Sequence, residues 1–395
     1  MQSATNAPLT MRGLLLCVHP RLDAAGQARL REFARSNPDW EKLLALATIH
    51  GLTPTFVNNL ESCAMDALHP SWRERFRGES LRNSCRNLAL TAELIHVLRA
   101  LQANGVTATP YKGLVLAVQA HGDVAMREFS DLDILVPQAH IVAAEKALLS
   151  MGFSRAVPSL NAGRGRIPGQ YAYSKGAAPA AGEREEVLVE LHTEYTLRYF
   201  PRRLNLAELC ARRQPLCLAG RQVLTFCPED TLLLLSVHGA KHFWERLGWI
   251  ADIAALAQSP GGLKWNSLIV RARAWQIERM LWFGLGLAAE LFDLHLPTDV
   301  TDCLERDSVA QQLMTAVSQR LLAGTQADLG LFSRFAFRVR MCGSLLAGLP
   351  YAMRLTFQPT EKDRGRHARF LEPLYALRRP LRLARTYGWR TRTGS

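Results

Sequence analysis

Several features that mark other protein classes are missing from this 395-residue sequence. Its eight cysteines form no Cys-x-x-Cys pair, which excludes a zinc ribbon and a thioredoxin-like redox motif. No uninterrupted apolar stretch approaches the roughly 18 residues of a membrane span. The apolar run at 14–18 lacks both the length and the small-residue cleavage site of a signal peptide. We therefore expect a cytoplasmic protein without a transmembrane segment.

Acidic residues are scarce relative to basic ones. Lys and Arg total 48 against 35 Asp and Glu, which leaves a net charge of +13. The excess is uneven, because residues 361–395 hold nine Arg and one Lys against three acidic residues. Aromatic side chains such as Tyr375 and Trp389 lie among these arginines, a combination that suits nucleic acid. A basic segment also suits an anionic membrane surface, and a solvated tail stays open as well.

Hydrophobic periodicity separates a small α/β module from the helical regions around it. Residues 1–104 have a helical pattern, and residues 105–200 mix short strand-like runs with helices. Residues 201–350 return to a helical pattern after Pro228, and residues 351–395 form a basic tail rich in Arg and Pro. The expected fold class is α+β, with the chemistry in the module.

The local boundaries follow from turn residues and side-chain alternation. A long helix is predicted over 70–103, opened by proline and closed by Asn-Gly. Strands are predicted at 106–111, which is rich in Val, Thr and Tyr, and at 132–136 and 186–192, where Val, Leu and Ile dominate. The segment 163–182, rich in Gly, Pro and Ala, is expected to be a flexible loop or an irregular hairpin.

Three carboxylates lie on two of the predicted strands. Asp131 and Asp133 alternate with Leu132 and Ile134, so the two acids share one face while the apolar pair faces the core. Glu190 lies between two apolar residues of a later strand and must also point away from the core. Like charges held close together are costly unless a cation lies between them. Hard oxygen ligands of this kind suit Mg²⁺, and a third acid could complete a two-metal site for displacement at phosphorus.

Two basic residues lie near these acids in the sequence. Lys112 and Gly113 stand at a predicted strand-to-helix turn, where a small residue and the first amides of a helix favour an anion. Lys112 could equally be an ordinary solvated lysine. Arg127 could contact phosphate or simply pair with Glu128 or Asp131.

The ordered set resembles the polymerase-β-like, or minimal, nucleotidyltransferase superfamily, which has a Gly-containing turn and helix, an Asp-x-Asp strand and a third acid on a later strand. It is more closely similar to a bacterial nucleotidyltransferase family whose turn reads Lys-Gly in place of Gly-Ser. Residues 189–192 (Val-Glu-Leu-His), 238–244 (His-Gly-Ala-Lys-His-Phe-Trp) and 247–252 (Leu-Gly-Trp-Ile-Ala-Asp) are similar to its downstream signatures. The resemblance covers roughly residues 70–260. It implies a small mixed-sheet core flanked by helical N- and C-terminal regions. Asp252 lies on the same helical pattern as Trp249 and is expected to be a structural residue.

The resemblance also implies roles for the acids. Asp131 and Asp133 match the metal-binding pair, and Glu190 matches the third acid, which ligates metal and helps to activate the attacking hydroxyl. Mg²⁺ is the implied cofactor, in a two-metal site. A Glu in place of Asp at the third position changes the reach of that carboxylate.

The nucleotide side of the site follows in the same way. Lys112 and Gly113 match the turn that holds the triphosphate, and Arg127 matches a basic residue just before the Asp-x-Asp strand. Gly113 lacks the Ser that follows in the superfamily turn, and the spacer 114–130 is longer than in polymerase β. Lys112 could therefore carry more of the phosphate contact.

Five further polar residues are placed at the edge of this site. Ser130 precedes the acidic strand, and His192 follows Glu190 by two residues, where a structural histidine is the commoner outcome. His238 and His242 lie four apart on one helix face beside Lys241. That spacing is compatible with zinc, but no third soft ligand accompanies the two histidines.

The resemblance implies transfer of a nucleoside monophosphate from an NTP, ATP included, to an unidentified hydroxyl or phosphate acceptor with release of pyrophosphate. The acceptor could be a small molecule, a glycan, a peptide or RNA. One alternative is a toxin-like or RNA-modifying nucleotidyltransferase that acts on tRNA and grips it with the basic tail. Another is a non-catalytic scaffold that binds a membrane or a protein partner through that tail.

Overall fold

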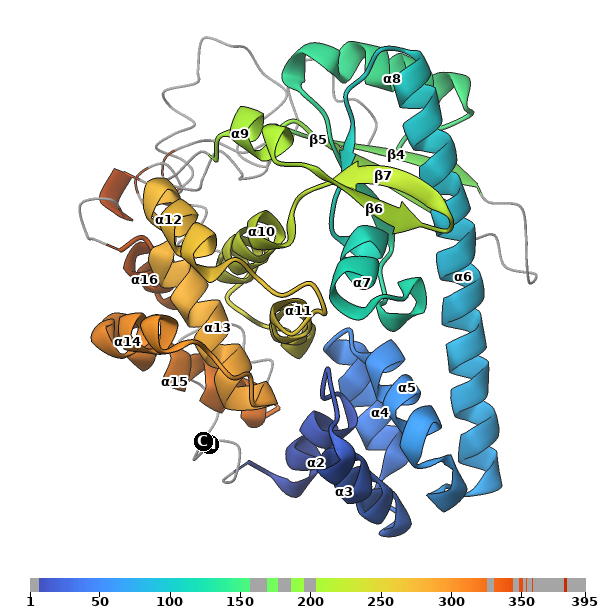
Figure 1. The fold of residues 1–395 in the computed structure, drawn as a ribbon, viewed down its shortest axis with the longest axis vertical. Coiled ribbons are helices and arrows are strands. Elements are labelled where there is room, and N and C mark those ends of the chain that lie inside the picture. Colours follow the sequence, from blue (N-terminus) through green and yellow to red (C-terminus); the bar gives the residue numbers. More distant parts are fainter. Residues whose placement is uncertain are drawn as a thin grey trace.

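The computed structural model describes residues 7–156, 169–176, 186–194, 204–324, 330–343 and 348–350, with Met353, Phe357, Pro380 and Leu381. It is a mixed α+β structure in which helices flank a small mixed sheet (Figure 1). The sheet lies at the top of the view, the N-terminal helices below it and the C-terminal helices to one side.

The N-terminal region is helical, as predicted. Its elements are α2 (Leu9–Cys17), α3 (Ala24–Arg35), α4 (Trp40–Ile49), α5 (Thr53–Cys63) and α6 (Pro70–Ala103). The side chains of Asp23 and Asp39 cap α3 and α4 by accepting from the backbone N–H groups of Gly26 and Lys42. The long helix α6 has the predicted bounds and runs along one side of the molecule up to the sheet (Figure 1).

A five-stranded sheet forms the centre of the α/β module. Its strands are β1 (Thr109–Pro110), β2 (Asp131–Leu135), β3 (Ser154–Arg155), β4 (Gln170–Gly176) and β5 (Glu186–His192), in the order β1-β2-β5-β4-β3. β2 and β5 run parallel, whereas the other neighbours are antiparallel. Helices α7 (Gly113–His121) and α8 (Ile141–Ser150) complete the module.

Of the two alternatives expected for segment 163–182, the flexible loop is wrong for residues 170–176, which pair antiparallel with the next strand as in a hairpin. The segment 163–182 contains the strand β4, which pairs along the whole of β5. Pairing with β5 and the burial of Tyr173 in the core stabilise this strand. The Gly- and Pro-rich sequence on either side of it is typical of a loop, which is why the strand is not evident from the sequence. The rest of the segment lies outside the described residues.

The C-terminal region begins with a hairpin that the helical pattern does not predict. After α9 (Leu206–Ala211), β6 (Gln214–Leu218) and β7 (Arg221–Thr225) pair through a two-residue turn. Both turn residues, Ala219 and Gly220, have positive φ, as a tight hairpin turn requires. The remaining helices are α10 (Pro228–Lys241), α11 (Leu247–Ala257), α12 (Trp265–Trp275), α13 (Glu278–Phe292), α14 (Thr298–Arg306), α15 (Ser308–Leu322) and α16 (Leu331–Met341).

The buried apolar side chains form two clusters. The smaller one joins the sheet to α8 and to the upper half of α6, where Leu90, Leu94 and Val97 face the strands. The larger one joins the N-terminal helices to α10–α15. Helix α7 contributes Leu114 to the first cluster and Leu116 to the second, so it lies between them. The division of the chain at 104, 200 and 350 stays a prediction.

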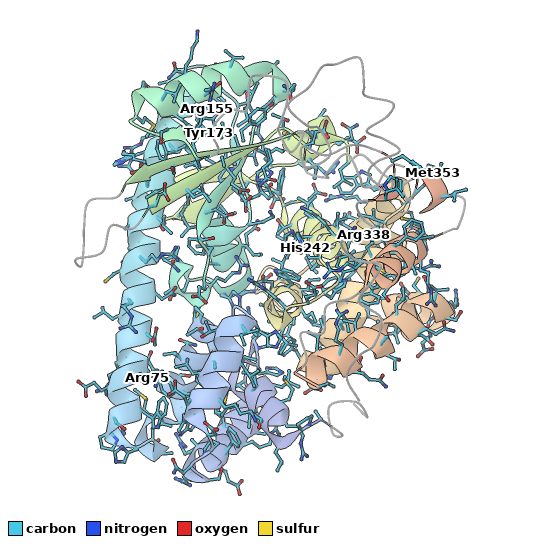
Figure 2. All side chains as sticks on the ribbon, turned by 180° about the vertical axis from the view of Figure 1, so that it is seen from behind. Arg75, Arg155, Tyr173, His242, Arg338 and Met353 are labelled. Carbon is cyan, nitrogen blue, oxygen red and sulfur yellow. The ribbon has the colours of Figure 1, made fainter. Side chains whose placement is uncertain are left out.

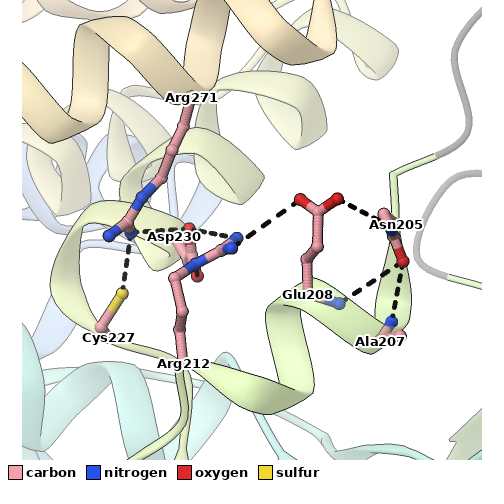
Figure 3. A network of polar contacts seen from close by, with 7 residues as sticks. All are labelled: Asn205, Ala207, Glu208, Arg212, Cys227, Asp230 and Arg271. Atoms are coloured by element: carbon pink, nitrogen blue, oxygen red, sulfur yellow. Dashed lines mark hydrogen bonds and ion pairs between the residues drawn. The ribbon is translucent and has the colours of Figure 1, made fainter.

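A buried polar network holds the hairpin side of the structure against α10 and α12 (Figure 3). The carboxylate of Asp230 has no exposed side-chain surface and accepts from Arg212 Nε and Arg271 Nη1, each at 2.9 Å. Arg271 also donates to Cys227 Sγ at 3.2 Å. A buried charge left unpaired costs about 3–5 kcal/mol, so these two ion pairs hold the first turn of α10 against Arg212 and α12.

The tail predicted at 351–395 lies outside the described residues, except for the four single positions named above. Within the described part of the chain, every helix is too short or too polar to cross a membrane.

Candidate functional site

Adjacent parallel strands carry the three carboxylates that the sequence singled out. Asp133 on β2 pairs in register with Glu190 on β5, and Asp131 lies two residues before Asp133 on the same face. Leu132 and Ile134 point the other way and are buried. The alternation inferred from the sequence therefore brings the acids to one face of the sheet.

His192 joins two of these acids. Its Nε2 lies 2.7 Å from Asp133 Oδ1 and 3.3 Å from Glu190 Oε2. Gln170 of β4 donates from its side-chain amide to Glu190 Oε2, and the ring of Tyr111 packs edge-on against the imidazole. Asp133 and His192 are both buried, so their polar atoms depend on one another for hydrogen bonds.

The pKa values in this cluster are displaced in opposite directions. Burial, and then the charges of Asp133 and Glu190, raise the pKa of Asp131 to about 6. Burial alone would raise the pKa of Asp133 too, but the cations of Lys112 and His192 hold it below its usual range. Burial would lower the pKa of His192, and its hydrogen bonds to Asp133 and Glu190 more than offset this and raise it. The cations of Lys112 and His192 thus stabilise the charged form of Asp133, whereas the charged form of Asp131 remains unfavourable.

The turn at Lys112 and Gly113 lies directly beside the acids. Lys112 has φ 58° and Gly113 has φ 36°, and α7 begins at Gly113. The ammonium of Lys112 lies 3.4 Å from both carboxylate oxygens of Asp133 and 5.0 Å from the ring centre of Tyr111. A positive φ at a non-glycine residue costs on the order of 1–3 kcal/mol and persists where surrounding structure imposes it. The predicted strand-to-helix turn is therefore present, and its lysine points at the acid cluster.

Arg127 has a partner that its sequence neighbours do not suggest. Its Nε and Nη2 donate to the two carboxylate oxygens of Asp252 on α11, at 2.7 and 2.9 Å. Its Nη1 donates to the backbone carbonyl of Gly113 at 3.1 Å. Burial would raise the pKa of Asp252, but Arg127 and then His121 hold it below its usual range. The guanidinium of Arg127 thus connects the turn, through Gly113, to Asp252 on α11 of the C-terminal helices.

The end of α10 and the start of α11 supply a second group of polar residues. The rings of His238 and His242 lie 4.6 Å apart, and each packs against Trp249 at 5.3–5.4 Å. Arg338 of α16 donates to the backbone carbonyl of Lys241 at 3.3 Å, and Figure 2 shows Arg338 beside His242.

The pKa values of His238, Lys241 and His242 are all lowered by burial and by nearby positive charge. Burial and then Lys112 lower the pKa of Lys241 to about 8, while the site's carboxylates act in the opposite direction. Burial, followed by Lys241, lowers the pKa of His242 to about 4. Burial and Lys112 also bring the pKa of His238 well below its usual value. Both imidazoles are therefore neutral at pH 7, and the ammonium of Lys241 is held where charge is unfavourable.

Two residues at the site had no clear signal in the sequence. Gln170 lies in the segment expected to be irregular, and only the pairing of β4 with β5 brings it to Glu190. Asp252 was expected to be structural, and no local pattern could assign Arg127 to it across 125 residues. Ser130 is exposed just before β2.

The donor set fits a divalent cation. Asp133, Glu190 and His192 each place one ligand atom within 4.8 Å of the others, and in the described part of the chain this is the one such group of three. Of the three predicted metal ligands, Asp133 and Glu190 belong to this group and Asp131 does not. Burial raises the pKa of Asp131 most, and the nearby charges of Asp133 and Glu190 raise it further, so a cation at this face would relieve that repulsion. The described residues bring no third ligand to His238 and His242, so zinc at that pair is not supported.

Comparison with known proteins identifies a family. The model of a family described as uncharacterised nucleotidyltransferase matches residues 36–293, which include every residue of the site described above except Arg338. No curated protein matches the sequence.

Two solved structures are distantly similar in fold. One is an antigenic nucleotidyltransferase-like protein from Paracoccidioides brasiliensis, at 13% identity and a TM-score of 0.37, covering 55% of this chain and 92% of that one. The other is the antibiotic-resistance factor ANT(2'')-Ia, at 16% identity and a TM-score of 0.31, covering 46% of this chain and 90% of that one. At these scores the roles of individual residues rest on this chain's own geometry.

Proposed function

Since the chain belongs to this family of nucleotidyltransferases, we propose that it transfers a nucleoside monophosphate from an NTP to a hydroxyl or phosphate acceptor and releases pyrophosphate. An acceptor oxygen would form a bond to the α-phosphorus, and the bond from that phosphorus to the bridging oxygen of pyrophosphate would break. For a hydroxyl acceptor, the proton would pass to a carboxylate of the site.

The observation that carries this proposal is the register of Asp133 with Glu190. Two carboxylates directly opposite on parallel strands, with Asp131 on the same face, are costly unless they serve a cation or a proton transfer. A structural role would be met more cheaply by apolar residues of similar volume.

The chain's own residues divide the work. Asp131, Asp133 and Glu190 would hold Mg²⁺ at one or two positions, and the ion would neutralise charge on the triphosphate and on the leaving pyrophosphate. Glu190 also accepts the acceptor's proton. His192 keeps Asp133 and Glu190 oriented through its two hydrogen bonds. The Gln170 amide fixes one Glu190 oxygen and leaves the other free to act.

Lys112 and the first amides of α7 would bind the triphosphate. The helix N-terminus favours an anion. The ammonium of Lys112 lies 3.4 Å from Asp133, and once a metal cation binds Asp133 the ammonium can turn to a phosphate oxygen. Lys241, whose pKa is lowered first by burial and then by the charge of Lys112, would meet the same anion.

The tRNA-acting and scaffold alternatives both depend on the basic tail, which lies outside the described residues. No described contact favours either of them, and we keep the acceptor open.

The test is transfer of label from α-³²P-labelled NTPs by the purified protein with Mg²⁺, offered small-molecule extracts and total RNA in parallel. The wild type should yield a labelled acceptor in one of the two sets and release pyrophosphate. Asp133→Asn should abolish transfer and Asp307→Asn, whose acid pairs with Arg279 among the C-terminal helices, should not. Equal transfer by Asp133→Asn and wild type would contradict the proposal.

A further inference from the structure

One side chain bridges the triphosphate-binding turn and the C-terminal helices. Arg127 uses Nε and Nη2 on the buried carboxylate of Asp252 and Nη1 on the carbonyl of Gly113. His121, at the last turn of α7, lies 4.0 Å from the same carboxylate. Asp252 is thus contacted by His121 at the end of α7 and by Arg127, which also bonds to Gly113 at the start of that helix. Helix α7 packs against α11 as well.

The carbonyl that Arg127 holds belongs to a strained piece of backbone. Lys112 and Gly113 both have positive φ, and at Lys112 this conformation is unfavourable for a side-chain-bearing residue. Lysine has no side-chain acceptor, so Lys112 at the N-cap position of α7 leaves the first amides of the helix without a side-chain cap. A fixed Gly113 carbonyl restricts the peptide between Gly113 and Leu114, and so restricts the backbone at the start of α7 to which Lys112 is joined. The ammonium of Lys112 lies 3.4 Å from Asp133 in this arrangement.

Resting on the function proposed above, we propose that Arg127 and Asp252 are positioning residues for nucleotide binding. Their buried, bidentate ion pair and the bond from Arg127 to Gly113 hold the turn in the conformation that receives the triphosphate. The ion pair makes α11 of the C-terminal helices part of the nucleotide site although Asp252 touches no substrate. In this arrangement Arg127 has its guanidinium behind the turn and is not itself the phosphate contact.

A second ion pair provides a matched control. Arg279 donates from Nε to Asp307 at 2.7 Å and from Nη1 to the carbonyl of Arg340 at 2.5 Å. This is the same combination of an aspartate and a backbone carbonyl on one guanidinium, but among α13, α15 and α16 instead of at the turn. Loss of either pair should cost stability, whereas only the first should alter nucleotide binding.

The experiment measures the Kd for a non-hydrolysable ATP analogue with Mg²⁺ by calorimetry, on the full chain. Its variants are Arg127→Lys and Asp252→Asn, with Arg279→Lys and Asp307→Asn as controls. Hydrogen exchange of peptides covering 110–121 is followed in the same proteins. Arg127→Lys keeps the charge but loses the bidentate geometry, so it remains informative if Asp252→Asn does not fold.

We expect Arg127→Lys to weaken binding of the analogue at least tenfold and to speed exchange in 110–121, with the controls within twofold of wild type. The double variant Arg127→Lys/Asp252→Asn should bind no more weakly than the worse single variant, because both remove one interaction. A folded Arg127→Lys that binds like wild type, or controls that lose as much affinity, would overturn the positioning role alone. A wild type that binds no nucleotide would overturn the proposed function with it.

Discussion

His192 on β5 places its Nε2 2.7 Å from Asp133 Oδ1 on β2 and so joins the two parallel strands at the acid cluster. The same nitrogen lies 3.3 Å from Glu190, the residue that pairs in register with Asp133. Groups that orient metal ligands typically contribute 10–100-fold to metal affinity.

We therefore predict that His192→Ala weakens binding of a divalent cation about 10–100-fold. His192→Gln, which keeps an N–H donor, should retain part of the affinity. Titration with Mn²⁺, followed by electron paramagnetic resonance of the free ion, measures this directly. Unchanged Mn²⁺ affinity in His192→Ala would show that the imidazole has no part in holding the acids.

Asp131 should destabilise the metal-free protein at neutral pH. Its pKa, raised to about 6 by burial and by Asp133 and Glu190, exceeds the ordinary value of 3.8. The folded state therefore binds this proton more tightly than the unfolded state, and stability falls as pH rises from about 4 to 6.

Asp131→Asn removes that dependence. Its Tm without metal should equal that of wild type near pH 4 and exceed it by a margin that grows up to pH 6 and then stays constant. Mg²⁺ should raise the Tm of the wild type and not of the variant. A Tm difference that is independent of pH would contradict the assigned pKa shift.

The charged form of Lys241 should also destabilise the folded protein, as the charged form of Asp131 does. Its pKa is lowered to about 8 from 10.5, chiefly by burial and Lys112, so its charged form is disfavoured in the folded state. Lys241→Met should raise the Tm at pH 7, with a gain that shrinks as pH rises from about 8 to 10.5. The same variant should bind the ATP analogue more weakly. Tighter binding in Lys241→Met would exclude a role for its ammonium in meeting the triphosphate.

The turn after Lys241 depends on close packing around Trp244. A Cβ added at Gly239 would lie 2.5 Å from the buried indole, so Gly239→Ala should cost about 1–3 kcal/mol in the free energy of unfolding. Gly78→Ala is the control, because in α6 the nearest atom to its Cβ is Arg82 Nη1 at 3.6 Å. That substitution should stabilise the protein by roughly 0.5–1 kcal/mol. Chemical denaturation of both variants checks this, and a stable Gly239→Ala would show that the indole can shift.

Local patterns in the sequence predicted the elements that carry the acids. The helix at 70–103 and the strand at 186–192 have the expected bounds. Proline and Asn-Gly mark the ends of the helix, and alternating valines and leucines mark the strand. The alternation at 131–134 was sufficient to place Asp131 and Asp133 on one face. These features depend on neighbours in the chain, which a sequence displays directly.

Features that depend on distant partners were not predictable in this way. The strand β4 exists through its ladder with β5, and its flanking composition is typical of a loop. The hairpin β6–β7 is marked only by Ala219 and Gly220. The pairing of Arg127 with Asp252 follows from the packing of α7 against α11, which no spacing in the sequence encodes.

The most direct test of the central claim is calorimetric binding of the Mg²⁺ complex of a non-hydrolysable NTP to wild type and Asp133→Asn. Both proteins should fold, since Asn keeps the shape of the side chain and one acceptor for His192. The account predicts that wild type binds the complex in a Mg²⁺-dependent manner and that Asp133→Asn loses this dependence. Binding by wild type that is the same with and without Mg²⁺, or full Mg²⁺-dependent binding by Asp133→Asn, would contradict it.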